Sequence, residues 1–211
     1  MSYQYFLFDW DGTIAHSLPT WLAIYQQILN DHSVKATSQQ LAETLYLDWQ
    51  TCENYGINFD EFSKKMHEKM SKEIPFAGLH DQVVETLTKL KHNGKKTAVV
   101  TSSHRHLIEP ALAHWKVTDL FDFTITRNEV THTKPHPEMV LTTMQKLGAQ
   151  SETTIMVGDS ETDVGAGKAA GITTAVYYPK ENEKFYSYEK VKSLNADYII
   201  RHFSELNDIA R

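Results

Sequence analysis

The chain has 211 residues, a formal net charge of -6 and a single cysteine, Cys52. This length allows one sizeable core with an insert or two modest domains, and a hydrophobic content of 41% predicts a packed interior. The mild acidity argues against a nucleic-acid binder and against binding to anionic lipid. One cysteine excludes an intrachain disulfide. Because the sequence also shows no signal-peptide pattern and no apolar run of bilayer length, we expect a cytoplasmic protein without a membrane partner.

Short apolar runs recur along the chain and are typical of buried strands. They occupy residues 5–8, 97–100, 123–126, 154–157, 174–177 and 198–200. Apolar residues spaced by three or four positions indicate helices between them, at residues 83–90, 107–115 and 140–147. Strands that alternate with helices predict an α/β fold, a Rossmann-like parallel sheet with helices on both faces.

Almost ninety residues separate the first apolar run from the next, and none of them forms a convincing strand pattern. Helical spacing appears instead in three groups: Trp21, Ile24, Tyr25 and Ile28; Leu41 and Leu45; and Phe59, Phe62, Met66 and Met70. A strand-to-helix connection is normally much shorter. We therefore predict an inserted α-helical cap domain at residues 15–76, with Pro75 and Gly78 near the return hinge. The catalytic core then comprises residues 1–14 and 77–211.

Polar residues follow four of the apolar runs. These residues are Asp9, Asp11 and Thr13; Thr101, Ser102 and Ser103; Lys134; and Asp159 with Asp163. Ligands of open parallel sheets bind beyond the carboxyl ends of the strands, so the fold would bring the four clusters to one edge. Each cluster alone is also explained by a turn or a helix cap. Their combined order favours a site with acids for a cation, and a lysine and hydroxyls for phosphate.

The same clusters resemble the four motifs of the haloacid dehalogenase superfamily. The matching segments are FDWDGT at 8–13, VVTSS at 99–103, Lys134 within TKPHPE, and VGDSETD at 157–163. The helical insert resembles the cap of the phosphoglycolate phosphatase and β-phosphoglucomutase branch. This resemblance implies a Mg²⁺-dependent phosphatase, a phosphoric monoester hydrolase that works through an aspartyl-phosphate. Its partner would be a small phosphorylated metabolite, either phosphoglycolate-like or a sugar or nucleotide phosphate, and the protein a monomer or weak dimer.

The resemblance also implies roles for the two aspartates of the first motif. Asp9 is expected to be the nucleophile. Asp11 is expected to protonate the leaving oxygen and then to activate water. The expected Mg²⁺ ligands are the Asp9 carboxylate, the Asp11 backbone carbonyl and Asp159, with Asp163 as a partner of the ligands.

The other motif residues are expected to contact phosphate or to support the aspartates. Thr101 and the backbone amide of Ser102 would bind the phosphoryl group, and Lys134 would stabilise the developing charge. Thr13 would order the first loop. Trp10 would offer its backbone amide to phosphate and its ring to the core.

Several residues permit two interpretations. His16 either contacts the substrate or is a polar residue at a hinge. Four residues of the insert either face the site or have no role in it: Trp49, Tyr55, Lys64 and Lys65. We favour the second interpretation, in which the aromatic residues belong to the interior of the insert and the lysines to its solvated surface. Segment 183–190 is expected to be a helix start or loop rather than a binding segment. The remaining histidines show no metal-ligand spacing.

Other reactions of the superfamily remain alternatives. A phosphomutase would carry an arginine in its cap, but residues 14–76 contain none. A phosphonate hydrolase needs a cap lysine that forms a Schiff base; Lys35, Lys64, Lys65, Lys69 and Lys72 are available without a distinguishing context. Dehalogenation is disfavoured by the presence of Asp11. A non-catalytic phospho-ligand sensor is the alternative from another class, and it would not be expected to retain all four motifs.

Overall fold

The computed structural model of the protein describes residues 2–44 and 48–210. Six strands form one parallel sheet in the order β3-β2-β1-β4-β5-β6. They are β1 (Tyr5–Phe8), β2 (Lys96–Val100), β3 (Phe123–Ile125), β4 (Thr154–Gly158), β5 (Thr173–Tyr177) and β6 (Tyr198–Ile200). The predicted α/β fold with a parallel sheet is confirmed. The first and last strands have the expected bounds, and each of the others differs by one residue at one end.

Helices cover both faces of the sheet. They are α4 (Val83–His92), α5 (Arg105–His114), α6 (Glu138–Leu147), α7 (Glu161–Ala169), α8 (Tyr188–Ser193) and α9 (Leu206–Ile209). Short 3₁₀ turns join them: η3 (Thr118–Leu120), η4 (Arg127–Glu129), η5 (Ser151–Thr153), η6 (Lys180–Lys184) and η7 (Phe203–Glu205). The helices expected at residues 83–90, 107–115 and 140–147 correspond to α4, α5 and α6. No helix in the described part of the chain has the length and apolarity that crossing a bilayer requires.

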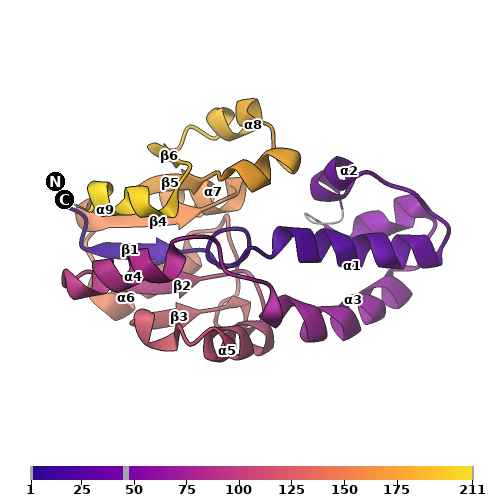
Figure 1. The fold of residues 1–211 in the computed structure, drawn as a ribbon, viewed down its shortest axis with the longest axis horizontal. Helices are drawn as coiled ribbons and strands as arrows, with labels where there is room; N and C mark the ends of the chain where they lie inside the picture. Colours follow the sequence, from indigo (N-terminus) through magenta and orange to yellow (C-terminus); the bar gives the residue numbers. More distant parts are fainter. Residues whose placement is uncertain (1, 45–47, 211) are drawn as a thin grey trace.

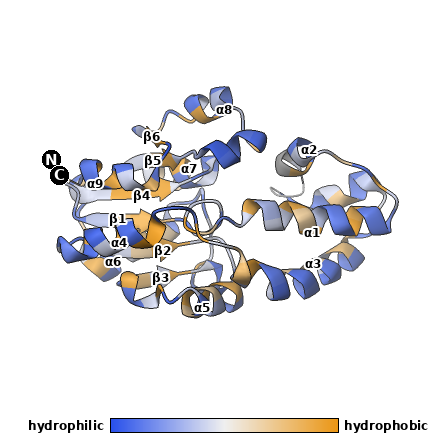
Figure 2. Cartoon of the chain, in the orientation of Figure 1, coloured by the Kyte–Doolittle hydropathy of each residue, from blue (hydrophilic) through white to orange (hydrophobic). Residues whose placement is uncertain are grey.

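The side chains of β1 alternate between the two faces of the sheet, and both faces are buried. Phe6 and Phe8 enter a hydrophobic cluster with α4, α5 and α9, whereas Leu7 enters a second cluster with α6 and α7. Successive strand residues point to opposite faces, so an uninterrupted apolar strand needs cover on both sides. Figure 2 shows the corresponding hydrophobic colouring of β2 and β4.

The remaining helices lie beyond the carboxyl ends of the strands (Figure 1). They are α1 (Leu18–Asp31), α2 (Ser38–Glu43), η1 (Trp49–Tyr55), α3 (Phe59–Glu73) and η2 (Ile74–Phe76), and we call them the helical insert. Their buried faces form a hydrophobic cluster of their own; Phe62, Met66 and Met70 contribute from α3. None of the described residues between α1 and η2 forms a strand, as expected. Leu45, expected on a helix, lies outside the described residues.

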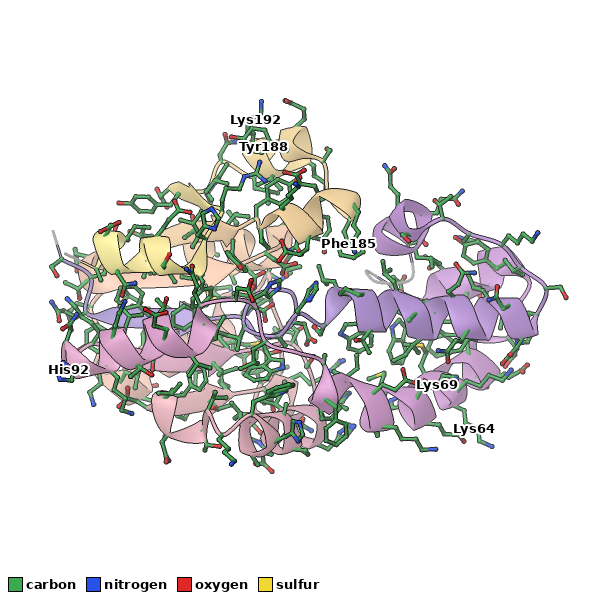
Figure 3. All side chains as sticks on the ribbon, viewed as in Figure 1. Lys64, Lys69, His92, Phe185, Tyr188 and Lys192 are labelled. Atoms are coloured by element: carbon green, nitrogen blue, oxygen red, sulfur yellow. The ribbon has the colours of Figure 1, made fainter. Side chains whose placement is uncertain are left out.

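Two residues attached to the sheet complete the cluster of the helical insert. Leu107 of α5 and Phe185, which follows η6, are both buried in it. Figure 3 shows Phe185 projecting toward the helical insert. The insert is therefore held over the sheet by packed side chains as well as by its two linkers.

The two linkers pair with each other. Ala15 and Leu79 form an antiparallel bridge, and the His16 N–H donates to the Gly78 carbonyl at 2.7 Å. This pairing places the ring of His16 against that of His80, with 4.8 Å between their centroids. Burial, with a further contribution from His16, lowers the pKa of His80 to about 4, against opposing effects of Glu181 and the Gly12 backbone.

This histidine makes stability depend on pH. An unfolded histidine titrates near pH 6.5, so the folded protein binds fewer protons than the unfolded chain between about pH 6.5 and about pH 4, and loses stability as the pH falls through that window. The free energy of unfolding should decrease by about 2 kcal/mol between about pH 7.5 and about pH 5 through this group. His80→Phe should remove that part of the pH dependence, measured by urea unfolding. The exposed His92 provides the control, His92→Phe; equal pH slopes in both variants would contradict the assignment.

Candidate active site

A cleft of about 720 Å³ lies between the carboxyl ends of the strands and the helical insert. Most of the residues expected at the site line it: Asp9, Asp11, Thr101, Ser102, Lys134 and Asp159. The strands carry these residues to one edge because all six run in the same direction. Figure 1 shows β1 and β4 pointing toward the helical insert.

Lys134 connects two of the carboxylates. Its ammonium lies 2.5 Å from Asp9 Oδ1 and 2.5 Å from Asp163 Oδ1, and all three side chains are buried. Burial alone lowers the pKa of Lys134, but the two carboxylates raise it above its ordinary value, so the lysine is charged. Burial raises the pKa of Asp9, and Asp163 and Asp11 add to this effect while Lys134 opposes it.

Asp159 completes a group of acids that fits a metal ion. Its Oδ2 atom is buried without a hydrogen-bond partner among the described residues. Burial raises its pKa, and the neighbouring Asp163 and Asp9 raise it further. Carboxylate oxygens of Asp9, Asp159 and Asp163 lie within 4.8 Å of one another. An unpartnered buried carboxylate beside two others is the environment that a hard cation with oxygen ligands satisfies.

Asp163 differs from Asp159 because both of its carboxylate oxygens have hydrogen-bond partners. Asp163 gives Oδ1 to Lys134, while its Oδ2 accepts hydrogen bonds from the Ser160 N–H and hydroxyl. Both oxygens therefore have partners, and Asp163 does not line the cleft. This geometry is compatible with the expectation that Asp163 supports the ligands.

Gly12 allows Asp159 to approach the first loop. Its φ of 76° is in the left-handed region, and a Cβ atom there would lie 2.4 Å from Asp159 Oδ2. Only glycine adopts this conformation freely and leaves that space empty. Glycine at position 12 is thus required both for the conformation of the turn and for the space that Asp159 occupies.

Asp11 is held by three donors. The Ser17 hydroxyl and the Trp21 indole N–H donate to Oδ1 at 2.6 and 2.9 Å, and the Ser103 hydroxyl donates to Oδ2 at 2.6 Å. Trp21 belongs to the helical insert, Ser17 immediately precedes it, and Ser103 follows β2. The carboxylate is oriented by groups from both sides of the cleft. Sequence periodicity assigned Trp21 only to a buried helix face, and the motif VVTSS was the one signal that pointed to Ser103.

Hydroxyl groups collect around the acids. Thr101 accepts a hydrogen bond from the Ser103 N–H at 3.1 Å. Ser102 Oγ and Thr13 Oγ1 are buried without partners among the described residues. Thr101 and Ser102 line the cleft, whereas Thr13 is fully buried and does not line it.

Trp10 and His16 were expected to contact phosphate or substrate, the first through its backbone amide. The ring of Trp10 is buried in the hydrophobic cluster of the sheet, as expected for its side chain. His16 does not line the cleft, because the pairing of the linkers turns its ring toward His80. This position favours the hinge interpretation of His16 over the interpretation as a substrate contact.

Residues of the helical insert also line the cleft, but not all the candidates do. Trp49 lines it, and its N–H donates to the Tyr25 hydroxyl at 3.2 Å. Tyr55 and the lysines do not: Lys64 points away from the sheet in Figure 3, and Lys65 pairs with Asp31 and Glu61.

Tyr186 is a cleft residue that periodicity and motifs did not reveal. It lies in the segment 183–190, which was expected to be a loop or helix start, and it lines the cleft beside the acids. Burial raises its pKa well above the ordinary value, and Asp159, Asp163 and Asp9 contribute. The phenol is therefore a neutral hydrogen-bond donor.

The chain is similar to known proteins over most of its length. The model of the family "haloacid dehalogenase-like hydrolase" matches residues 6–177. Pyrophosphatase PpaX of Oceanobacillus iheyensis is 28% identical, over 98% of this chain and 96% of the relative. The Bacillus cereus protein of the same name is 30% identical over 80% of each chain.

Solved structures share the fold. A putative haloacid dehalogenase-like hydrolase from Bacteroides fragilis matches with a TM-score of 0.83 and 24% identity, covering 97% of this chain and 99% of that one. A putative phosphoglycolate phosphatase from Lactobacillus plantarum matches with a TM-score of 0.81 and 19% identity, covering 99% and 100%. The match to the family model agrees with the four clusters of polar residues that follow the strands, since residues from all four line one cleft. The chain belongs to the haloacid dehalogenase-like hydrolases.

Proposed function

We propose that the protein is a Mg²⁺-dependent phosphatase that hydrolyses a small phosphorylated metabolite through an aspartyl-phosphate at Asp9. The observation that carries this proposal is the imbalance of charge in the cleft. Asp9, Asp11 and Asp159 line the cleft and Asp163 lies behind them, while the Lys134 ammonium contacts only Asp9 and Asp163 among the described residues. A further cation bound beside these acids would offset the repulsion that they exert on an anionic substrate.

The carboxylates fit that cation. Asp9, Asp159 and the Asp11 backbone carbonyl are the proposed Mg²⁺ ligands, and their oxygens are the donors that Mg²⁺ prefers. When bound, Mg²⁺ would neutralise phosphoryl oxygens as a Lewis acid. A relative of this fold, YfnB of Bacillus subtilis, has been solved bound to magnesium; it is 18% identical to this chain with a TM-score of 0.76.

The two steps of the reaction are assigned to the two aspartates. A carboxylate oxygen of Asp9 forms a bond to phosphorus while the bond from phosphorus to the leaving oxygen breaks, and Asp11 gives that oxygen its proton. Water then attacks the phosphorus of the acyl phosphate, Asp11 takes the proton, and Asp9 is released with inorganic phosphate. Thr101, the Ser102 amide and Lys134 hold the phosphoryl oxygens.

The hydrogen bonds of Asp11 permit both of its protonation states. The Trp21 indole can only donate, whereas the hydroxyls of Ser17 and Ser103 donate or accept by rotation. A protonated Asp11 can thus keep Ser103 as an acceptor without moving its carboxyl group.

The helical insert is the proposed cap, corresponding to residues 15–76 over a core of 1–14 and 77–211. Closing elements of this kind exclude water and complete the pocket. The insert lines the cleft with aromatic side chains, and the core adds Tyr186. The aromatic residues from the insert are Trp21, Tyr25, Trp49 and Phe59. This lining favours a small leaving group rather than a macromolecule.

Pyrophosphate is the second candidate substrate. The two relatives compared above carry the name pyrophosphatase. The cleft of this chain contains Arg127 and Lys190 in addition to Lys134. These cations suit a substrate whose leaving group is itself anionic.

Asp9→Asn should abolish hydrolysis of p-nitrophenyl phosphate in the presence of Mg²⁺. We expect a loss of at least about a thousandfold in kcat, because the amide is a poor nucleophile. Asp60→Asn, at an exposed position of α3, should retain activity. If Asp9→Asn keeps most of its activity, the nucleophile assignment is wrong. A non-catalytic sensor, by contrast, would show no hydrolysis with or without Mg²⁺.

Gly12→Ala tests the requirement for space beside Asp159. The added Cβ collides with Asp159, so we expect Mg²⁺ affinity and kcat to fall by at least about tenfold. Gly94→Ala is the matched control, since Gly94 has a similar φ of 73° and a methyl group added there would meet no atom within 4 Å. It should lose only about 1 kcal/mol of stability and remain active. Equal Mg²⁺ affinities in calorimetry would contradict the proposed ligand geometry.

Trp21→Phe removes one donor from Asp11 and keeps an aromatic ring. A hydrogen bond to a charged group contributes about 1.5–3 kcal/mol, so we expect kcat to fall by about ten- to a hundredfold. The control is Trp49→Phe, which removes an N–H that binds Tyr25 in the same cleft. A kcat for Trp21→Phe equal to that of the control would show that the indole does not position Asp11.

A further inference from the structure

A second group of metal-ligating side chains lies outside the cleft, on the loop that carries Lys134. His132, His136 and Glu138 each offer one ligand atom, and these atoms lie within 4.8 Å of one another. Both histidines are exposed and Glu138 is half-buried. The structure differs here from the expectation that the remaining histidines have no metal-ligand partners. The loop turns into α6, and this turn brings the Glu138 carboxylate to the two imidazoles.

The carboxylate of this group is fixed in place. Glu138 accepts the backbone N–H groups of Thr131 and His132 at 2.8 and 2.9 Å. Its Oε2 also lies 3.0 Å from His132 Nδ1.

The two imidazoles are held next to each other. Their ring centroids are 4.5 Å apart with an angle of 35° between the planes. The Glu138 N–H donates to His136 Nδ1 at 3.2 Å, which links the second ring to the same residue. Backbone N–H groups thus fix the Glu138 carboxylate, and Glu138 contacts both His132 and His136.

We propose that His132, His136 and Glu138 form a site for Zn²⁺ or a similar late transition-metal ion, separate from the carboxylates of the cleft. Two imidazoles and a carboxylate, with water in the fourth position, are a donor set typical of zinc. Mg²⁺ prefers oxygen ligands and is not expected to compete here. The chain would then hold two cation sites that differ in their chemistry.

The site's position connects it to the cleft. Lys134 lies between the two histidines in the chain and buries its ammonium against Asp9 and Asp163. An ion bound by His132 and His136 would join the two sides of the loop on its exposed surface. The loop would then be held from both its buried and its exposed side.

Zinc titration by calorimetry tests the site. Because Zn²⁺ can also enter the cleft, the titration uses Asp159→Asn, whose folding is checked by circular dichroism. We expect one Zn²⁺ to bind, and adding His136→Ala to weaken this binding by at least about tenfold. Adding His106→Ala instead should leave it unchanged. His106 is a fitting control because it is exposed and lies beside another histidine, with 5.4 Å between the rings of His104 and His106.

Spectroscopy tests the same ligands in the wild-type protein, independently of the Asp159 variant. With Mg²⁺ in excess, one equivalent of Cu²⁺ should give an electron paramagnetic resonance spectrum with nitrogen couplings from the imidazoles of the proposed site. His67 and His104 line the cleft and also offer nitrogen, so the ligands are assigned by comparing the variants. His136→Ala should lose part of these couplings, and His106→Ala should keep them. Unchanged zinc affinity or unchanged nitrogen couplings in His136→Ala would overturn the proposal, as would an Asp159→Asn protein that folds and binds no zinc.

Discussion

The ammonium of Lys134 between Asp9 and Asp163 is the interaction on which the rest of the site depends. The parallel sheet places β1 and β4 side by side, so the acids that follow these strands are forced together at one edge. Their mutual repulsion is tolerable only because a buried cation lies among them. Removing one partner of a buried ion pair typically costs about 3–5 kcal/mol. The lysine therefore supports the fold at the same point at which it would stabilise a phosphoryl group.

The helical insert belongs to this arrangement through Asp11. Two of the three donors to its carboxylate come from Ser17 and Trp21, at the start of the insert, and the third is Ser103 beside the sheet. Any displacement of α1 against the sheet therefore changes the surroundings of the proposed acid and base. Leu107 and Phe185 add packing across the same boundary. The position of the helical insert therefore determines the orientation of the Asp11 carboxylate.

Much of the fold is readable from the sequence because buried strands and amphipathic helices leave periodic patterns. The runs at residues 5–8 and 198–200 match their strands, and the strand-end acids follow directly from the topology. Contacts between distant segments leave no such pattern. The indole of Trp21 looks like any buried helix residue until α1 is docked, and His16 meets a histidine from the other linker. Tyr186 reaches the cleft from a segment with no motif.

The most direct test of the account is to find the phosphoryl group on Asp9. The wild-type protein would be mixed rapidly with Mg²⁺ and a radiolabelled phosphate monoester and quenched with acid. One half of the sample is counted for bound label, and the other half is reduced with borohydride, which releases the phosphate and converts the aspartyl group to homoserine. We predict label on the protein in the presence of Mg²⁺ only, and a peptide in which residue 9 has become homoserine. Turnover without a labelled protein, or a mark at another residue, would contradict the central role of Asp9.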